Sequence, residues 1–186
     1  PAHGVFIVEM GAKQRADIKE RCDLMEHEMG IITSGGEMHL ETFGSVENVA
    51  RTKFELYDAL PKGSFCAVNI DSEYAMRHIE ERALDVATYG VENTAAKYRA
   101  TDIIYSPTET RFSLVTPKGV EENYATHILG RGNILNIVAS LAVADHLGIG
   151  VEARRRAVRQ IEAVEHRLSV RRNGGITILD DAYNSN

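Results

Sequence analysis

The stretch "IITSGGEMHLETFGSVENVARTK", residues 31–53, has the pattern of a strand, a glycine turn and a helix. Apolar residues open the stretch, two glycines follow, and Ser45 stands where a helix N-cap is expected. On a helix that begins after Ser45, six residues fall within about 60° of Lys53: Val46, Val49, Ala50, Leu56, Tyr57 and Leu60. The pattern therefore predicts a strand, a turn and a helix that carries a lysine on its buried side.

Lys53 has two interpretations from the residues alone. A lysine commonly runs its aliphatic stem past the core and keeps its ammonium in water. If the amine is buried instead, desolvation favours its neutral form and lowers its pKa. A neutral amine can react with CO₂ to give a carbamate, which is a carboxylate-like ligand for a hard cation such as Mg²⁺. Both interpretations stay open at this point.

The composition suits a single globular domain or a large part of one. The chain has 186 residues, 44% of them hydrophobic, and a formal net charge of -6. That charge argues against a nucleic-acid partner, because phosphate binding needs clustered Lys and Arg. One basic run, "EARRRAVRQ" at residues 152–160, is expected to be a helix with its arginines on the solvated outer face.

The two cysteines, Cys22 and Cys66, have neither a metal-binding spacing nor a disulfide framework. The sequence contains no signal peptide and no run of about 18 apolar residues. These features predict a cytoplasmic protein without membrane insertion. The sequence opens with "PAHGVFIVEM", already entering a strand, and stops at "ILDDAYNSN", just as a polar turn begins, so we expect a piece of a longer protein.

Strand and helix patterns alternate along the first half of the chain, which predicts an α/β fold with a mostly parallel sheet flanked by helices. Alternating segments in the second half predict an added, small antiparallel ribbon with a Pro-Lys-Gly hairpin turn. We expect strands at 5–10, 30–33, 64–70 and 176–179, ribbon segments at 85–89, 98–106, 111–116 and 120–125, and helices at 17–28, from 46, 72–82, 133–147 (buried) and 151–164 (amphipathic).

A polar group stands at or just after the end of each apolar run in the strands expected at 5–10, 30–33, 64–70 and 176–179. Because ligands bind beyond the carboxyl ends of parallel strands, these groups are candidates for one site. The simpler explanation for any one of them is an ordinary polar turn. A carboxylate, an imidazole and the Lys53 site together suit Mg²⁺ beside a phosphate. The groups are Glu9, His39, Asp71, and Asp180 with Asp181.

Four motifs are similar to those of the Mur ligase family, the ATP-dependent ligases of peptidoglycan precursor synthesis. They are "FIVEMGA" with "ADI", "HLETFGSVENVARTKFEL", "LGRGNILNIVASLAVADHLGI", and "HRLSV" followed by "ILDDAYNSN", in the family's order. The second and fourth resemble the branch that joins D-Ala-D-Ala to UDP-N-acetylmuramoyl-tripeptide. The resemblance implies the family's central ATP-binding domain, with a P-loop/Rossmann-like fold, across residues 1–186.

The resemblance also implies roles for individual residues. Glu9 and His39 match Mg²⁺ ligands, and Lys53 matches a carbamylated lysine that completes the metal site, which makes Lys53 and His39 the catalytic candidates. Other residues match groups that bind ATP: Asn133 and Asn136 at the adenine, and Arg167 and Asp181 at the phosphates and ribose. Without the resemblance, Asn133 is a helix N-cap and Arg167 is an ordinary surface charge.

The sequence departs from the family pattern at Ser34 and Gly132, and it contains no G-x-x-G-K-[ST] phosphate loop. The expected unit is therefore a partial central domain without its first strand, its phosphate loop and both flanking substrate domains. We expect it to be inactive alone and to belong to a monomeric full-length enzyme. The alternatives are another Mur ligase, a ligase like folylpolyglutamate synthase, or a degenerate domain that only binds a partner.

Overall fold

The computed structural model describes residues 4–33 and 40–183. The chain divides into two compact units, one formed by Pro1–Cys66 with Ser72–Val86 and the other by Ala67–Asp71 with Ala87–Asn186. Over the described ranges, none of the helices combines the length and the apolar character needed to cross a membrane.

Six strands form one sheet in the order β1-β2-β3-β4-β5-β6. They are β1 (Met29–Ile32), β2 (Phe65–Asn69), β3 (Ala87–Gly90), β4 (Tyr98–Tyr105), β5 (Thr110–Thr116) and β6 (Gly119–Thr126). β2 pairs in parallel with β3 and β3 with β4, whereas β4, β5 and β6 are antiparallel neighbours. The predicted fold class, a parallel sheet with an antiparallel ribbon and flanking helices, is confirmed.

The burial of the strands follows their pairing. Cys66, Ala67 and Val68 on β2 are at most 1% exposed, as expected for a parallel strand that is covered on both faces. On β5, buried residues alternate with more exposed ones, as in an antiparallel strand that packs one face on a core. The hairpin between β5 and β6 turns at Pro117 and Lys118, as the sequence predicts.

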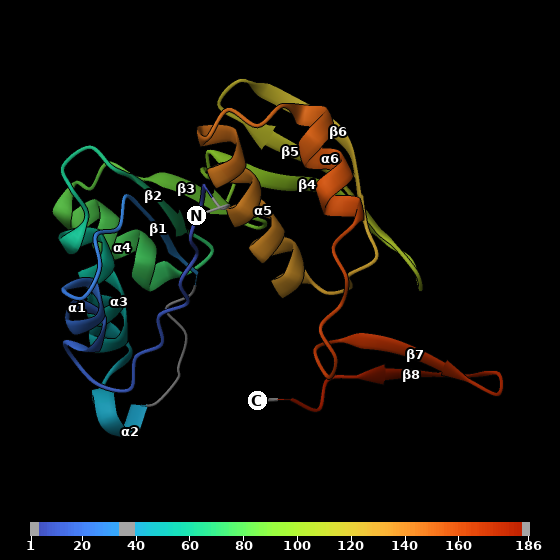
Figure 1. The fold of residues 1–186 in the computed structure, drawn as a ribbon, viewed down its shortest axis with the longest axis horizontal. Helices are drawn as coiled ribbons and strands as arrows, with labels where there is room; N and C mark the ends of the chain where they lie inside the picture. Colours follow the sequence, from blue (N-terminus) through green and yellow to red (C-terminus); the bar gives the residue numbers. More distant parts are fainter. Residues whose placement is uncertain (1–3, 34–39, 184–186) are drawn as a thin grey trace. The chain divides into compact units, whose positions relative to one another are not determined.

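The first unit is built around α3 (Val46–Ala59), which packs on β1 and on α1 (Asp17–Cys22), α2 (Leu40–Phe43) and α4 (Glu73–Arg82), as Figure 1 shows. The predicted N-cap at Ser45 is confirmed, and Ser72 caps α4 in the same way. The Ser45 hydroxyl accepts the N–H of Asn48 at 3.2 Å, and the Ser72 hydroxyl accepts the N–H of Ala75 at 3.4 Å. These bonds satisfy N–H groups that have no partner inside the helix.

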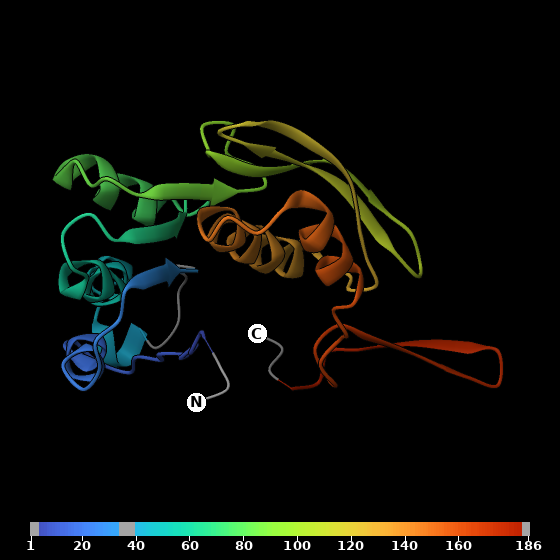
Figure 2. The same cartoon turned by 45° about the horizontal axis from the view of Figure 1, so that its top comes forward.

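In the second unit, α5 (Arg131–His146) packs on β3 and β4, and α6 (Val151–Arg159) packs on β6 and α5. Figure 2 shows both helices on one face of the antiparallel ribbon. Ile134, Val138 and Ala142 of α5 are completely buried, which agrees with the burial predicted for this helix. A separate antiparallel pair, β7 (Ser169–Asn173) and β8 (Ile176–Asp180), follows α6.

Four expected elements differ from the structure, and one strand was not expected. The segment at 85–89 was expected in the antiparallel ribbon, but it forms β3, which pairs in parallel with both β2 and β4. Residues 5–10 form no strand, and Phe6 is 86% exposed, because no described segment pairs with them and a lone strand leaves its backbone groups unsatisfied. The first and last helices end early, at Cys22 and Arg159, since Leu24 and Val164 beyond them find no core to pack on. The strand β7 was not expected, and it takes β8 into its own small sheet.

Candidate functional site

Lys53 lies in the middle of α3, on the buried side of the helix. Its neighbours Thr52 and Phe54 are 1% exposed, and Val49 and Ala50 one turn earlier are 2% exposed. Lys53 itself is partly buried. The predicted position of Lys53 on the buried stripe is therefore confirmed.

Burial lowers the pKa of the Lys53 amine below its ordinary value of 10.5. Desolvation penalises the ammonium more than the neutral amine, which increases the share of the form that reacts with CO₂. The environment of Lys53 therefore fits a carbamate, and a carbamate fits a magnesium ion because it offers charged oxygen atoms.

Of the other two predicted metal ligands, Glu9 lies within the described residues and His39 does not. Glu9 lies in the irregular segment before α1 and its side chain is exposed. His39 and Ser34 lie outside the described residues. Among the residues with described positions, no three His, Cys, Asp or Glu side chains gather into a metal site. The ligand set of Glu9, His39 and Lys53 stays a prediction.

The two asparagines predicted to contact adenine lie in the first turns of α5. Gly130 is the N-cap and adopts a φ of 93°, so Asn133 is inside the helix and the N-cap interpretation of Asn133 was wrong. The side-chain amide of Asn133 donates to the carbonyl of Leu129 at 2.8 Å, which orients it back toward the helix start. Asn136 is one turn further on and exposed.

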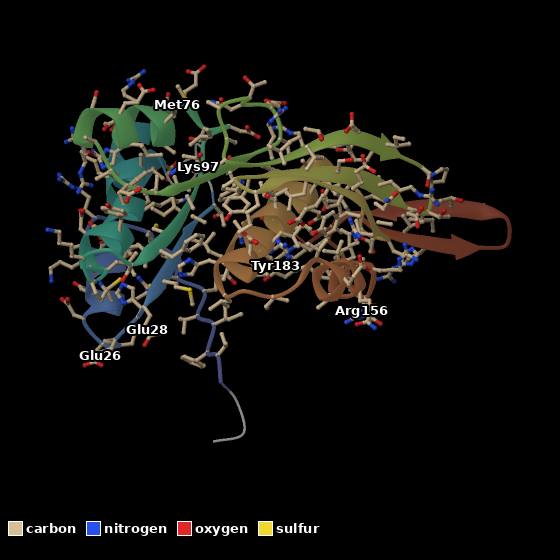
Figure 3. The ribbon with its side chains drawn as sticks, turned by 90° about the horizontal axis from the view of Figure 1, so that it is seen from above. Glu26, Glu28, Met76, Lys97, Arg156 and Tyr183 are labelled. Atoms are coloured by element: carbon tan, nitrogen blue, oxygen red, sulfur yellow. The ribbon has the colours of Figure 1, made fainter. Side chains whose placement is uncertain are left out.

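Arg167 and Asp181 lie at the base of the β7–β8 pair, where the chain segments around them are neighbours. The N–H of Leu168 donates to Asp181 Oδ1 at 3.1 Å, and the N–H of Tyr183 donates to the carbonyl of His166 at 3.0 Å. The Arg167 guanidinium carbon is 4.4 Å from the centre of the Tyr183 ring, the residue labelled in Figure 3. The structure thus brings two predicted nucleotide-binding residues together.

Asp180 adds a charged group beside this pair. His166 Nδ1 lies 2.8 Å from Asp180 Oδ2, and Arg171 Nη2 lies 3.3 Å from the same oxygen. Desolvation raises the pKa of Asp180, but the N–H of Ala182 and the bond to His166 outweigh it, so the pKa is lowered. Asp180 therefore carries its negative charge at neutral pH.

A buried charge cluster between the β5–β6 hairpin, α5 and α6 escaped the sequence analysis. The basic run was expected to face solvent, yet Arg154 is 4% exposed, whereas Arg156 points outward from α6 (Figure 3). Arg154 Nη2 donates to Glu121 at 2.7 Å and lies 3.4 Å from Asp145, which also binds Lys118 at 2.8 Å. The sequence does contain a sign of this cluster, since Asp145 lies inside the apolar run "SLAVADHLGI" and a buried carboxylate needs a charged or hydrogen-bonding partner.

The Mur ligase middle domain matches residues 2–144 of this sequence. The chain belongs to the Mur ligase family. The UDP-N-acetylmuramoyl-tripeptide–D-alanyl-D-alanine ligase of Bacillus subtilis is 28% identical to it over 182 residues, which cover 97% of this chain and 38% of that protein. A second family branch is also similar: UDP-N-acetylmuramoyl-L-alanyl-D-glutamate–2,6-diaminopimelate ligase 2 of Clostridium acetobutylicum is 29% identical over 164 residues, 88% of this chain and 33% of that protein.

A solved structure supports the same assignment. The crystal structure of MurF ligase from Thermotoga maritima in complex with ADP superposes on this Mur ligase chain with a TM-score of 0.82 and 25% identity, covering 95% of this chain and 40% of that one. The chain therefore spans between 33% and 40% of the length of these three relatives. The roles assigned to Asn133, Asn136, Arg167 and Asp181 stay predictions.

Proposed function

We propose that this chain is the ATP-binding middle part of a ligase of peptidoglycan precursor synthesis, which joins D-Ala-D-Ala to UDP-N-acetylmuramoyl-tripeptide. The observation that carries the proposal is the similarity to a ligase named for this reaction over 97% of the chain. The partly buried Lys53 supports it, because its lowered pKa suits a carbamate in such a site.

The reaction proceeds in two steps. The terminal carboxylate of the UDP-linked peptide first takes the γ-phosphoryl group of ATP, which gives an acyl phosphate and ADP. The amine of D-Ala-D-Ala then attacks the acyl carbon, the bond to the phosphate oxygen breaks, and inorganic phosphate and the amine proton leave. Stabilising the charge that moves during phosphoryl transfer is the main task of such a site.

Glu9, His39 and carbamylated Lys53 are the proposed ligands of a magnesium ion in this site. When bound, the ion neutralises charge on the phosphate and carboxylate oxygens. The chain's own contribution at Lys53 is desolvation, which favours the neutral amine that a carbamate requires. The fixed position of Lys53 on the capped helix α3 holds the resulting carboxylate-like group in place.

The second unit of the chain supplies the proposed nucleotide contacts. Asn133 and Asn136 are three positions apart on α5, which places both amides on one face of the helix to contact adenine. Arg167 and Asp181 are the proposed contacts to phosphate and ribose. They are held near each other because the N–H of Leu168, the residue after Arg167, donates to Asp181. We also propose that the 186-residue chain alone does not ligate, because its sequence contains no G-x-x-G-K-[ST] loop to hold the ATP phosphates.

The test is a ligation assay with the full-length protein. Its two readouts are the release of inorganic phosphate and the mass of the product. ATP-dependent joining of D-Ala-D-Ala to UDP-N-acetylmuramoyl-tripeptide is expected. Asn133→Ala should weaken ADP binding about tenfold through the loss of hydrogen bonds, whereas Ser140→Ala, an exposed residue of the same helix, should leave it unchanged.

Other outcomes of this assay identify the alternatives. Turnover with diaminopimelate or with a folate and glutamate, but not with D-Ala-D-Ala, would assign the protein to another branch of these ligases. An absence of ATP-dependent turnover with all of these substrates would leave a domain that binds without catalysis.

A further inference from the structure

Asp71, just beyond the end of β2, holds the loop that follows β3. Its Oδ2 accepts the N–H of Val91 at 2.8 Å, and its Oδ1 accepts the N–H of Asn93 at 2.8 Å. The N–H of Glu92 lies 3.1 Å from Oδ1 and 3.2 Å from Oδ2. Three successive backbone N–H groups therefore converge on one carboxylate, an arrangement that binds anions in many proteins.

The fit between Asp71 and this loop is close. A Cβ atom added to Gly90 would lie 2.4 Å from Asp71 Oδ1, so a larger residue at position 90 would displace the carboxylate. Further bonds fix both sides of the contact. The amide of Asn93 donates to the carbonyl of Ile70 at 3.1 Å, and the N–H of Asp71 donates to Asn69 Oδ1 at 3.0 Å.

The same loop is connected to the start of α5. Glu92 forms an ion pair with Arg131, the first residue of α5. Asn133 follows two residues later, and its amide is turned back toward Leu129 at the helix start. α5 also packs directly on β3, the strand that ends at Gly90. The loop held by Asp71 therefore borders the turn of α5 that carries Asn133.

We propose that Asp71 is a positioning residue for the nucleotide site. It does not touch the nucleotide; its carboxylate fixes residues 91–93, and through Glu92 and β3 these set the place of the first turn of α5. The inference rests on the proposed function, in which Asn133 contacts adenine. It adds a residue that follows β2, in a part of the sequence separate from all the nucleotide contacts proposed above.

The experiment measures ADP binding by calorimetry in the full-length protein with Asp71→Asn and, separately, Gly90→Ala. Asp71→Asn keeps the shape but presents an amide N–H₂ to N–H donors, and Gly90→Ala pushes the carboxylate away without altering it. Both variants are expected to weaken ADP binding about tenfold. Asp102→Asn is the matched control, because Asp102 is an exposed carboxylate on β4, and its Kd should stay within about twofold.

Two further measurements separate positioning from a loss of folded protein. Hydrogen exchange of the amides at 91–93 should accelerate in both variants while exchange in β5 stays slow. In both variants the KM for ATP should rise together with the Kd for ADP. The kcat at saturating ATP and the KM for D-Ala-D-Ala should stay within about threefold of the wild-type values. A purely structural role would lower kcat through a smaller active fraction and leave the KM for ATP unchanged.

Arg131→Gln tests the connection without touching the loop. It should weaken ADP binding in the same direction by about two- to threefold, since its ion pair with Glu92 is exposed. ADP binding within twofold of wild type in Asp71→Asn and Gly90→Ala, with exchange at 91–93 accelerated, would overturn the inference and leave the proposed function intact. If the wild-type protein binds no ADP, the proposed function and the inference both fail.

Discussion

Lys53→Met is expected to make the protein more stable and to abolish ligation. Burial lowers the pKa of the Lys53 amine below its ordinary value of 10.5. Between these two pKa values the unfolded chain binds more protons than the folded one, so stability rises with pH across that window. Below the folded-state pKa, the amine is charged in both states and its desolvation opposes folding, whereas methionine has no charge to desolvate.

The size of this gain follows from the surroundings of Lys53. Methionine is unbranched like the lysine stem and suits the same partly buried position on α3. Replacing a buried ion pair by apolar side chains is neutral or stabilises proteins by up to about 4 kcal/mol, and for the single, partly buried amine of Lys53 we expect a gain of ~1 kcal/mol because water still screens it. In a domain of about 150–250 residues, this corresponds to an increase in Tm of about 2–4 °C.

The assay compares thermal unfolding in CO₂-free buffer with ligation in the presence of bicarbonate. Arg51→Met is the control on the same helix, because the Arg51 side chain is 59% exposed and its loss should change stability by less than about 0.5 kcal/mol. Carbon-13 NMR with labelled bicarbonate should show a carbamate in the wild type and in Arg51→Met, and none in Lys53→Met.

Two results would refute different parts of this reasoning. A Lys53→Met protein less stable than Arg51→Met would show that the ammonium stabilises the fold, and the argument from burial would be wrong. A Lys53→Met protein that ligates at more than a tenth of the wild-type rate would exclude the carbamate role while leaving the stability argument intact.

Two further predictions concern the second unit. Arg154→Met should destabilise the protein by about 3 kcal/mol in urea unfolding, because it leaves the buried Asp145 and the half-buried Glu121 without their shared cation, whereas the exposed Arg156→Met should cost less than about 0.5 kcal/mol; equal costs would refute this. Leu114→Ala should cost about 2–5 kcal/mol in the same assay, since Leu114 is 0% exposed and its loss leaves a cavity; a cost under about 1 kcal/mol would show that the core collapses around it.

The features that sequence predicted well depend on near neighbours along the chain. Ser45 caps α3 by accepting an N–H only three residues away. Counting helical turns from that cap then gives the side of the helix on which Lys53 lies. The turn at Pro117 and Lys118 is equally local. Such signals are present in a short stretch, so they can be read without knowing the fold.

The features that sequence missed depend on partners far along the chain. Strand β7 has the polar sequence "SVRRN" and is a strand through its pairing with β8, while the apolar residues 5–10 are irregular where no described partner adjoins them. Asp71 could be suspected from its place after a strand, but its bonds reach residues 20 to 22 positions away. Neither pattern nor spacing indicates which loop a carboxylate will hold.

Lys53 and Arg154 are both basic residues withdrawn from water, and the difference between them decides which can take part in chemistry. Arg154 is the more deeply buried, but ion pairs with Glu121 and Asp145 compensate its charge, and a guanidinium keeps its proton. An amine can lose its proton, and burial moves the Lys53 equilibrium in that direction. Burial therefore makes Arg154 a structural link between α6 and the hairpin, and it makes Lys53 a group that can react with CO₂.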